Sequence, residues 1–229
     1  MRYTSLLCGS ILLAAGAAVC LGGARMNGQR IELPEPILKG DTSVEEAIGR
    51  RRSRRSFAER ALTLRQVSQL LWSAQGATGE RGRLRAAPSA GATYPLEVLV
   101  AVGDGGVERL PAGIYRYVSS DHSLMKMAEG DARARVARAA LEQESLAAAP
   151  VDILIAADYR RTTRRYGERG VRYVHMEAGH VGQNIYLQAE ALGLATVAVG
   201  AFEDEKVAAA FGLPDELKPL YLMPVGHAR

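Results

Sequence analysis

Five arginines flank Ser53 within residues 49–57, which read GRRRSRRSF. A guanidinium stays charged at any ordinary pH, and its fork of N–H donors matches two oxygens of a phosphate. The Ser53 hydroxyl adds a further donor to this set. The stretch therefore predicts a pocket for a small anion such as phosphate. The alternative is a set of solvated cations at the C-terminal end of a helix, where they interact favourably with the helix dipole.

Helical spacing divides these arginines into two groups. A helix predicted over residues 44–53 carries an apolar stripe, and Arg51 and Arg55 continue that stripe at spacings of three and four residues. An inward guanidinium needs an anion, because an unpaired buried charge is very costly. We therefore expect Arg51 and Arg55 to bind the anion, and Arg50 and Arg54 to be solvated.

Two stretches of small residues allow a ligand to approach the backbone. In APSAGATYP (87–95), which precedes a predicted strand, Ser89, Gly91 and Thr93 leave such room. VAVGAFEDEK (197–206) runs from a strand into a helix start, where free backbone N–H groups can bind an anion or an electron-rich ring atom. Each pattern alone is also typical of an ordinary turn.

Helices and strands alternate along the chain around these stretches. Hydrophobic periodicity, punctuated by glycine and proline, predicts each element. The predicted strands cover residues 96–102, 113–118, 123–128, 151–158, 195–202 and 219–226, and the predicted helices cover residues 44–53, 62–77, 131–146, 171–192 and 203–213. The connections are mixed, so the class is α+β or α/β with a central sheet.

The composition excludes several function classes. With 48% hydrophobic and 24% charged residues, the chain of 229 residues has enough apolar material for a globular core. A net charge of only +4 and 6% aromatic residues argue against a nucleic-acid partner, which usually needs a broad basic surface. Both cysteines, Cys8 and Cys20, precede residue 21, so the rest of the chain has no disulfide, thiolate metal ligand or cysteine nucleophile.

The N-terminal segment predicts export or membrane anchoring. Residues 5–24 carry no charge and follow a short head with Arg2, which is typical of a signal peptide. About 20 apolar residues also suffice for an anchor in contact with the membrane. We expect residues 1–24 to be a signal peptide or anchor, residues 25–40 a linker and residues 41–229 one domain. The domain would then lie in the periplasm or cell envelope, or in the cytoplasm if the segment is not a signal.

Four segments, taken together, resemble the nitroreductase superfamily of FMN-dependent oxidoreductases, specifically its SagB-type dehydrogenase branch. They are RRSRRSF, PSAGATYPLEVLVAV, YGERGVRYVHMEAGHVGQNIYLQAEALGL with its continuation ATVAVGAFEDEKVAAAFGLP, and LYLMPVGHAR. Each is weak alone, but their order and separations are specific. The resemblance covers residues 41–229.

The resemblance implies an α+β nitroreductase-like fold, with a central, mainly antiparallel sheet flanked by helices. It implies a homodimer with the long helix at 171–192 in its core and FMN at the subunit interface. It also implies a ping-pong cycle in which NADH or NADPH supplies electrons and a small electron-poor molecule accepts them. The protein would supply binding, orientation and electrostatics, and the flavin the redox chemistry.

Three groups of residues match the flavin contacts of this family. The first group would contact the phosphate and the polar side of the flavin, and it consists of Arg51, Arg52, Ser53, Arg55 and Arg229. The second group would reach the flavin from the partner subunit, and it consists of Pro88 and Ser89. The third group would face the flavin ring near N5 with its backbone, and it consists of Val199, Gly200 and Ala201.

One position departs from the pattern of the azoline-oxidising members. They are expected to carry a Lys-Tyr pair where this chain has Arg165-Tyr166. Arginine cannot act as a general base at ordinary pH, whereas a perturbed lysine can. Tyr166 remains the catalytic candidate, as a proton donor or acceptor. The pattern therefore favours generic hydride transfer, with an azoline dehydrogenase acting on peptides and a non-catalytic flavin-binding envelope protein as alternatives.

Overall fold

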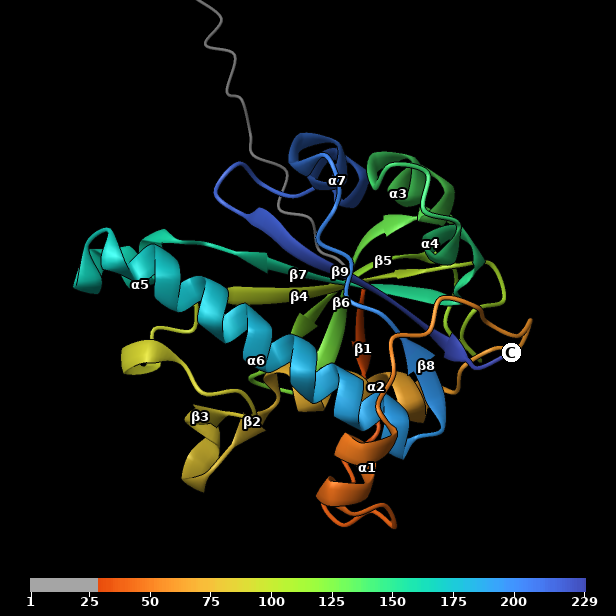
Figure 1. The fold of residues 1–229 in the computed structure, drawn as a ribbon. Helices are drawn as coiled ribbons and strands as arrows, with labels where there is room; N and C mark the ends of the chain where they lie inside the picture. Colours follow the sequence, from red (N-terminus) through yellow and green to blue (C-terminus); the bar gives the residue numbers. More distant parts are fainter. Residues whose placement is uncertain (1–28) are drawn as a thin grey trace, which may run out of the picture.

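A seven-stranded sheet runs through the middle of the fold (Figure 1). The structure, a computed structural model, describes residues 29–229, so the predicted signal or anchor lies outside the described residues. The strands of the sheet are β1 (Arg30–Glu32), β4 (Leu96–Val102), β5 (Gly113–Val118), β6 (Ser123–Glu129), β7 (Val151–Ala157), β8 (Leu194–Thr196) and β9 (Lys218–His227). Their order is β1-β6-β5-β4-β7-β9-β8, and every neighbouring pair is antiparallel. The predicted α+β class with a central antiparallel sheet is confirmed.

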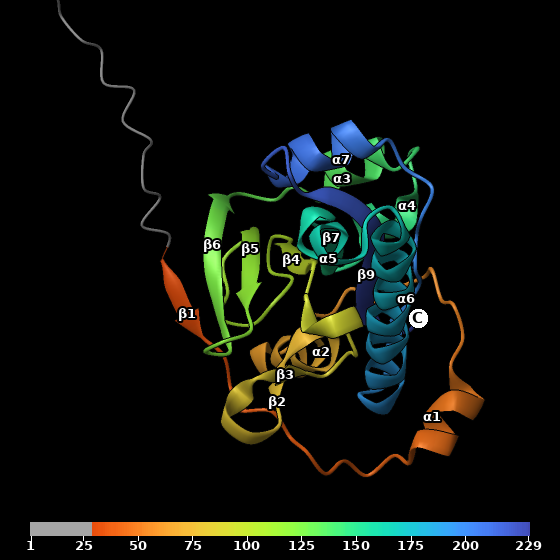
Figure 2. The ribbon, with the colours of Figure 1, turned by 90° about the vertical axis from the view of Figure 1, so that its left-hand side faces the viewer.

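Helices cover both faces of this sheet, as Figures 1 and 2 show. The helices are α1 (Val44–Arg50), α2 (Leu64–Gln75), α3 (Arg133–Ala139), α4 (Glu144–Ala148), α5 (Arg160–Tyr166), α6 (Arg169–Ala191) and α7 (Asp204–Phe211). Helices α3, α4 and α7 lie on one face, and α2 and α6 lie on the other. A short hairpin, β2 (Ala77–Thr78) and β3 (Leu84–Arg85), follows α2.

Alternate residues of the central strands feed two separate cores. In β4, Val100 faces the layer of α2 and α6, whereas Leu99 faces the layer of α3, α4 and α7. In β7, Ile153 and Leu154 divide in the same way, and all four side chains are buried. Because successive side chains point to opposite faces, a strand covered on both sides is apolar throughout. This is why both strands were evident as apolar runs, each interrupted by one acidic residue, Glu97 in β4 and Asp152 in β7.

Helix α6 is the element that spans the candidate site. Its 23 residues give a length of about 34 Å at 1.5 Å per residue. Buried side chains recur along it at helical spacing, including Val174, Val181 and Ile185, and this stripe packs on the sheet and on α2. The predicted helix over 171–192 is confirmed, with two further residues at its start.

The first helix ends earlier than predicted. It stops at Arg50 instead of Ser53, because Arg51 leaves the helical region with φ −47° and ψ 124°. Beyond it, Ser53 forms a parallel bridge with Thr196, and the Arg54 backbone N–H donates to the Thr196 carbonyl at 3.0 Å. Hydrogen bonds to β8 thus replace the last helical turn, a tertiary effect that local spacing does not reveal.

Three other segments differ from the sequence-based expectations. The helix predicted over 131–146 is divided into α3 and α4, because Leu141 and Glu142 adopt φ values near +58°. The strand predicted over 195–202 ends at Thr196. Within the predicted linker, β1 pairs with β6, so this part joins the sheet. In the described range, no helix is long and apolar enough to cross a membrane.

Candidate functional site

Three chain segments converge beside the C-terminal half of α6. The backbone of Ser53 pairs with that of Thr196 at the end of β8. Further along, Phe57 pairs with Ala228, and the backbone N–H of Arg229 donates to the Ser56 carbonyl at 3.4 Å. The arginine stretch, the turn after β8 and the C-terminus therefore lie together, as the resemblance implied. We call the five residues of the first predicted group the arginine cluster: Arg51, Arg52, Ser53, Arg55 and Arg229.

A hydrogen-bond relay holds Ser53 against α6. The Tyr186 hydroxyl lies 2.9 Å from Ser53 Oγ and accepts the backbone N–H of Ala198 at 2.7 Å. Since that N–H donates to the phenol oxygen, the phenol proton is available for Ser53 Oγ. In this arrangement the Ser53 hydroxyl can donate its own proton to a ligand.

The arginines of the cluster are free of carboxylate partners. Arg51 stacks on Tyr186, with Cζ 5.2 Å from the ring centroid, and Arg52 donates only to backbone carbonyls. Within residues 29–229, no carboxylate lies within 4.0 Å of Arg51, Arg52, Arg55 or Arg229. Unpaired guanidinium groups around a serine hydroxyl form a suitable environment for a phosphate.

Arg54 and Arg55 do not lie as the helical spacing predicted. Arg54, expected to be solvated, pairs with Glu190 at 3.3 Å, and the Glu190 side chain is only 11% exposed. Arg55, expected to point inward, is exposed. The reason is the early end of α1, after which the 3.6-residue period no longer applies. Arg55 stays a site prediction on the motif match alone.

The turn after β8 is anchored on both sides and leaves donors available. Val199 exchanges both backbone hydrogen bonds with Leu222 of β9, at 2.8 and 2.9 Å. The Ala201 carbonyl accepts the Gln143 side-chain amide at 2.9 Å. The N–H groups of Gly200 and Ala201 donate to no other described residue, and both residues are exposed. Nearby, the buried Thr196 Oγ1 has no hydrogen-bond partner in the described chain.

The second predicted group and Tyr166 lie together, at the other end of α6. We call Pro88, Ser89, Gly91 and Tyr166 the tyrosine cluster. A Cβ placed on Gly91 would lie only 2.4 Å from the Tyr166 hydroxyl oxygen, so these groups are in direct contact. Arg165 Nη1 also donates to the Gly91 carbonyl at 3.3 Å.

The loop of the tyrosine cluster is held in a constrained conformation. Gly91, Ala92 and Tyr94 have φ values of +60°, +54° and +45°. The Tyr94 N–H donates to Ser89 Oγ at 3.0 Å, and the Thr93 hydroxyl lies 2.8 Å from that of Thr162 on α5. Left-handed non-glycine residues persist only where the surroundings enforce them, and they concentrate at functional sites.

Sequence reasoning missed two residues of α6 that support these clusters, Tyr186 and Glu177. Glu177 is only 2% exposed, and its carboxylate accepts the Gln75 side-chain amide at 3.4 Å. Burial raises the pKa of Glu177, while hydrogen bonds from Ser89 and Gln75 act in the opposite direction. The available signal was a polar residue on the inward stripe of a long amphipathic helix.

One chain does not bring the two clusters together. The Tyr166 ring packs edge-on against Tyr173 at 5.2 Å, whereas Tyr186 holds Ser53 near the opposite end of the same helix. About 20 Å of helix separates Tyr173 from Tyr186. Within one chain, the two clusters therefore do not form one site for a small ligand.

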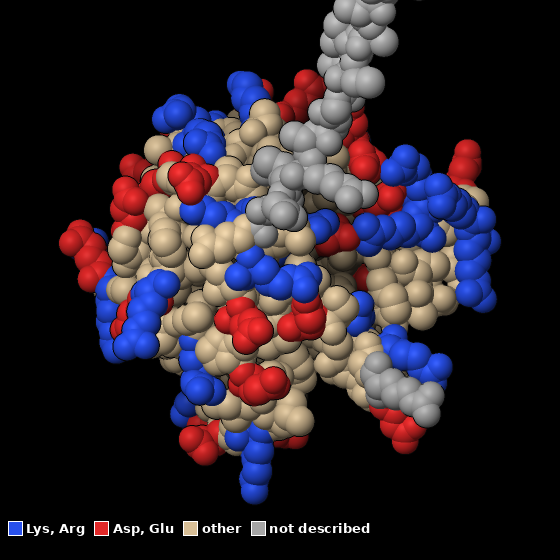
Figure 3. All heavy atoms as spheres, turned by 180° about the vertical axis from the view of Figure 1, so that it is seen from behind, with Lys and Arg blue, Asp and Glu red and all other residues tan. Residues whose placement is uncertain are grey.

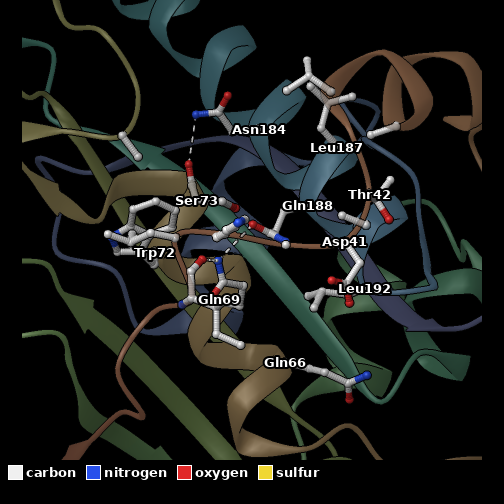
Figure 4. Close-up of a pocket in the computed structure, with 18 of the residues that line it drawn as sticks. Asp41, Thr42, Gln66, Gln69, Trp72, Ser73, Asn184, Leu187, Gln188 and Leu192 are labelled. Atoms are coloured by element: carbon white, nitrogen blue, oxygen red, sulfur yellow. Dashed lines mark hydrogen bonds between the residues drawn. The ribbon is translucent and has the colours of Figure 1, made fainter.

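A cavity of about 870 Å³ lies between residues 37–44, α2 and the C-terminal half of α6 (Figure 4). Two hydrogen bonds cross beside it, from Gln69 to Gln188 at 3.1 Å and from Asn184 to the Ser73 carbonyl at 2.9 Å. None of the predicted site residues lines this cavity.

Comparisons with known proteins agree with one another. The pattern of the Nitroreductase family matches residues 48–227. A candidate nitroreductase of Methanocaldococcus jannaschii is 46% identical over 201 residues, which cover 87% of this chain and 98% of that protein. A solved structure from Ralstonia eutropha, also a candidate nitroreductase, has a TM-score of 0.76 at 28% identity and covers 87% of this chain and 90% of its own.

A more distant similarity joins the chain to a peptide-processing protein. The microcin B17-processing protein of Escherichia coli is 26% identical over 155 residues, which cover 66% of this chain and 57% of that protein. The family match over residues 48–227 includes every predicted site residue except Arg229.

Proposed function

The chain belongs to the nitroreductase family of flavin oxidoreductases, and from this premise we propose that it is an FMN-dependent oxidoreductase. It takes electrons from NADH or NADPH and passes them to a small electron-poor acceptor at the same site, in a ping-pong cycle. The observation that carries the proposal is the pair of incomplete clusters at the two ends of α6. Two chains in a dimer can join them into complete sites.

The arginine cluster fits the phosphate of FMN. Arg51, Arg52, Arg55 and Arg229 have no carboxylate partners in the described chain, so their charges are available to the phosphate oxygens. Ser53 can donate its proton to the phosphate when the Tyr186 hydroxyl donates to Ser53 Oγ. Charge-assisted hydrogen bonds of this kind are about twice as strong as neutral ones.

The turn after β8 fits the edge of a flavin ring. The absence of a side chain at Gly200 allows close approach, and the N–H groups of Gly200 and Ala201 are free to donate to a ring atom. The pairing of Val199 with Leu222 fixes the direction of these donors. When bound, FMN supplies the hydride and electron transfer, and these residues orient it and tune its surroundings.

Tyr166 is the residue that we assign to proton transfer. Its hydroxyl is held against Gly91, and its ring is held by Tyr173. A phenol can hold a proton at Oη and donate it to an acceptor as electrons arrive. Pro88 and Ser89, on the same loop as Gly91, close the partner's site from this side.

Exposed apolar side chains favour a homodimer. Ile37, Leu38, Val44 and Ile48 are 50–79% exposed on the segment that leads into and through α1, and Met176 is 52% exposed on the outer face of α6. Large apolar side chains grouped in this way mark interaction surfaces. A second copy of the chain, with α6 in the interface, would cover them.

A visible absorption spectrum tests the proposal most simply. We expect the purified protein to be yellow, to contain FMN, and to bleach during anaerobic titration with NADH or NADPH. Addition of a quinone to the reduced protein should restore the colour. Protein that cannot be reconstituted with FMN would refute the proposal, and protein that binds FMN without reduction by either donor would support a non-catalytic flavin-binding role instead.

The second candidate is an azoline dehydrogenase acting on heterocycle-containing peptides. The similarity to the microcin B17-processing protein favours it, whereas arginine at position 165 opposes it because it cannot act as a base. The test is to incubate the flavin-loaded protein with a thiazoline-containing peptide and to measure the product mass by mass spectrometry, since oxidation removes two hydrogen atoms.

For the N-terminal segment, we propose export or anchoring to the membrane. Sequencing the N-terminus of the mature protein tests this proposal.

A further inference from the structure

Six arginines lie between residues 160 and 172, on α5 and the first turns of α6, and only two of them are paired. Arg160 pairs with Asp158 at 3.0 Å, and Arg161 pairs with Glu97 at 2.6 Å. These two pairs tie α5 to the end of β7 and to β4. They account for the first two arginines as structural.

The other four arginines are exposed and form no ion pair with any described residue. They are Arg164, Arg165, Arg169 and Arg172. Within residues 29–229, no carboxylate lies within 4.0 Å of any of them, and Glu168 between them forms no ion pair. Figure 3 shows basic side chains gathered over this part of the surface. Because the net charge of the chain is only +4, this is a local concentration of positive charge.

Two tyrosines join the middle of this patch into one array. Arg165 Cζ lies 5.4 Å from the Tyr166 ring centroid, the Tyr166 and Tyr173 rings meet edge-on at 5.2 Å, and Arg169 Cζ lies 5.9 Å from the Tyr173 ring. Stacking on a ring orders a guanidinium while leaving its N–H donors available. The array therefore presents aromatic surface and ordered positive charge side by side.

The array adjoins the tyrosine cluster. The Tyr166 hydroxyl contacts Gly91, and Arg165 donates to the Gly91 carbonyl at 3.3 Å. Gly91 lies on the same loop as Pro88 and Ser89, which we place against the flavin of the partner subunit. A molecule entering beside Tyr166 thus meets the arginines.

We propose that the arginine–tyrosine array selects an aromatic electron acceptor that carries carboxylate, sulfonate or phosphate groups. The guanidinium forks bind the anionic groups, and the tyrosine rings pack against the planar body that receives the electrons. This inference rests on the proposed function and names its substrate class. The same chemistry would also fit the 2′-phosphate of NADPH, so the test distinguishes binding of the acceptor by the array from binding of the donor.

The test compares a charged with a neutral quinone in the FMN-loaded enzyme. Anthraquinone-2,6-disulfonate and menadione are used as acceptors, and the variant is Arg165→Gln with Arg169→Gln. We expect the KM for the disulfonate to rise by about tenfold or more, while that for menadione changes by less than about twofold, because only the charged acceptor loses ion pairs. Calorimetric binding of the disulfonate to the oxidised enzyme should weaken in parallel.

Two control variants separate the array from general charge and folding effects. Arg138→Gln removes an exposed arginine of α3, on the far side of the sheet, and should leave both KM values unchanged. Arg165→Lys with Arg169→Lys keeps the charge and should retain most of the preference for the disulfonate. Added salt should raise the KM of the disulfonate in the wild-type enzyme, because salt screens exposed charges.

The outcomes distinguish this inference from the proposed function. If the arginine substitutions changed the KM of both quinones equally, or changed neither, the inference would be overturned. Reduction of menadione by the same enzyme would still support the proposed function. A larger rise in the KM for NADPH than in the KM for NADH, with unchanged quinone selectivity, would assign the array to the donor and overturn the assignment to the acceptor. If the wild-type enzyme reduced neither quinone with either donor, the proposed function itself would fail.

Discussion

Gly91 is the position where a single methyl group tests the contact with Tyr166. Replacing it with alanine introduces two separate costs. Its φ of +60° is unfavourable for any residue with a Cβ, by about 1–2 kcal/mol. The added Cβ would also lie 2.4 Å from the Tyr166 hydroxyl oxygen, whereas carbon and oxygen normally stay about 3.3 Å apart. The hydroxyl must therefore move by about 1 Å.

Gly212→Ala is the matched control for the backbone cost. Gly212 ends α7 with φ +64°, and a Cβ there would meet nothing within 4 Å. We expect each variant to lower the free energy of unfolding by about 1–2 kcal/mol in urea denaturation. A displacement of about 1 Å at a reacting group can cost up to about 100-fold in rate. Gly91→Ala should therefore also lower kcat/KM by about 10- to 100-fold, and Gly212→Ala should not.

A double variant shows whether the tyrosine hydroxyl is the cause. Tyr166→Phe removes the atom that the new methyl group would approach most closely, and leaves only the flexible Arg165 side chain, whose Nη1 and Cζ lie at 3.0 and 3.1 Å, among the three nearest atoms. Gly91→Ala should therefore have little further effect on kcat/KM in that background. If the effects of Gly91→Ala and Tyr166→Phe on kcat/KM were strictly additive, the reasoning would be refuted. A Gly91→Ala variant with the same kcat/KM as Gly212→Ala would also refute it.

Three further substitutions test other parts of the structure. Tyr186→Phe leaves the Ala198 N–H without its acceptor, and we expect a loss of about 1–3 kcal/mol in urea denaturation and about tenfold weaker FMN binding in a fluorescence titration. Arg54→Ala leaves the largely buried Glu190 unpaired and should cost about 1–2 kcal/mol, against less than about 0.5 for Arg55→Ala. Asp152→Asn should raise the thermal midpoint near neutral pH, because both carboxylate oxygens of this buried residue lack hydrogen-bond partners among residues 29–229.

The sign of the Asp152 effect follows from its burial, which raises the pKa of the carboxyl well above its ordinary value. Between the ordinary pKa of the unfolded chain and the raised pKa of the folded protein, folded Asp152 holds a proton that the unfolded chain has released. The free energy of unfolding therefore falls as pH rises through this range. Asp152→Asn should remove that slope, and an unchanged slope would contradict the assignment. Equal costs for Arg54→Ala and Arg55→Ala would contradict the ion pair, and unchanged FMN affinity in Tyr186→Phe would contradict the relay.

The sheet and the long helix could be predicted because their patterns are local. The strands at 96–102 and 151–157 are apolar runs, each with a single acidic residue, and both are covered on both faces; α6 repeats its buried side chains over 23 residues. The start of α1, where the Ser43 side chain accepts the Glu46 N–H, and the end of α2 at Gly76 are equally local.

The details of the arginine stretch could not be predicted in the same way. Whether Arg54 or Arg55 turns inward depends on the bridge between Ser53 and Thr196, residues that are far apart in sequence. The supporting role of Tyr186 depends on the same long-range contact. The motif match located the cluster, whereas the orientation of its side chains came from tertiary pairing.

The central claim is that the arginine cluster of one chain and the tyrosine cluster of another form one flavin site. Co-expression of Arg51→Ala/Ser53→Ala with Gly91→Ala/Tyr166→Phe, each with a different affinity tag, yields a purified mixed dimer. If the clusters come from different chains, one of its two sites is wild type at every position. The account predicts about half of the wild-type activity and FMN content from two weakly active parents. A mixed dimer no more active than its parents would contradict it.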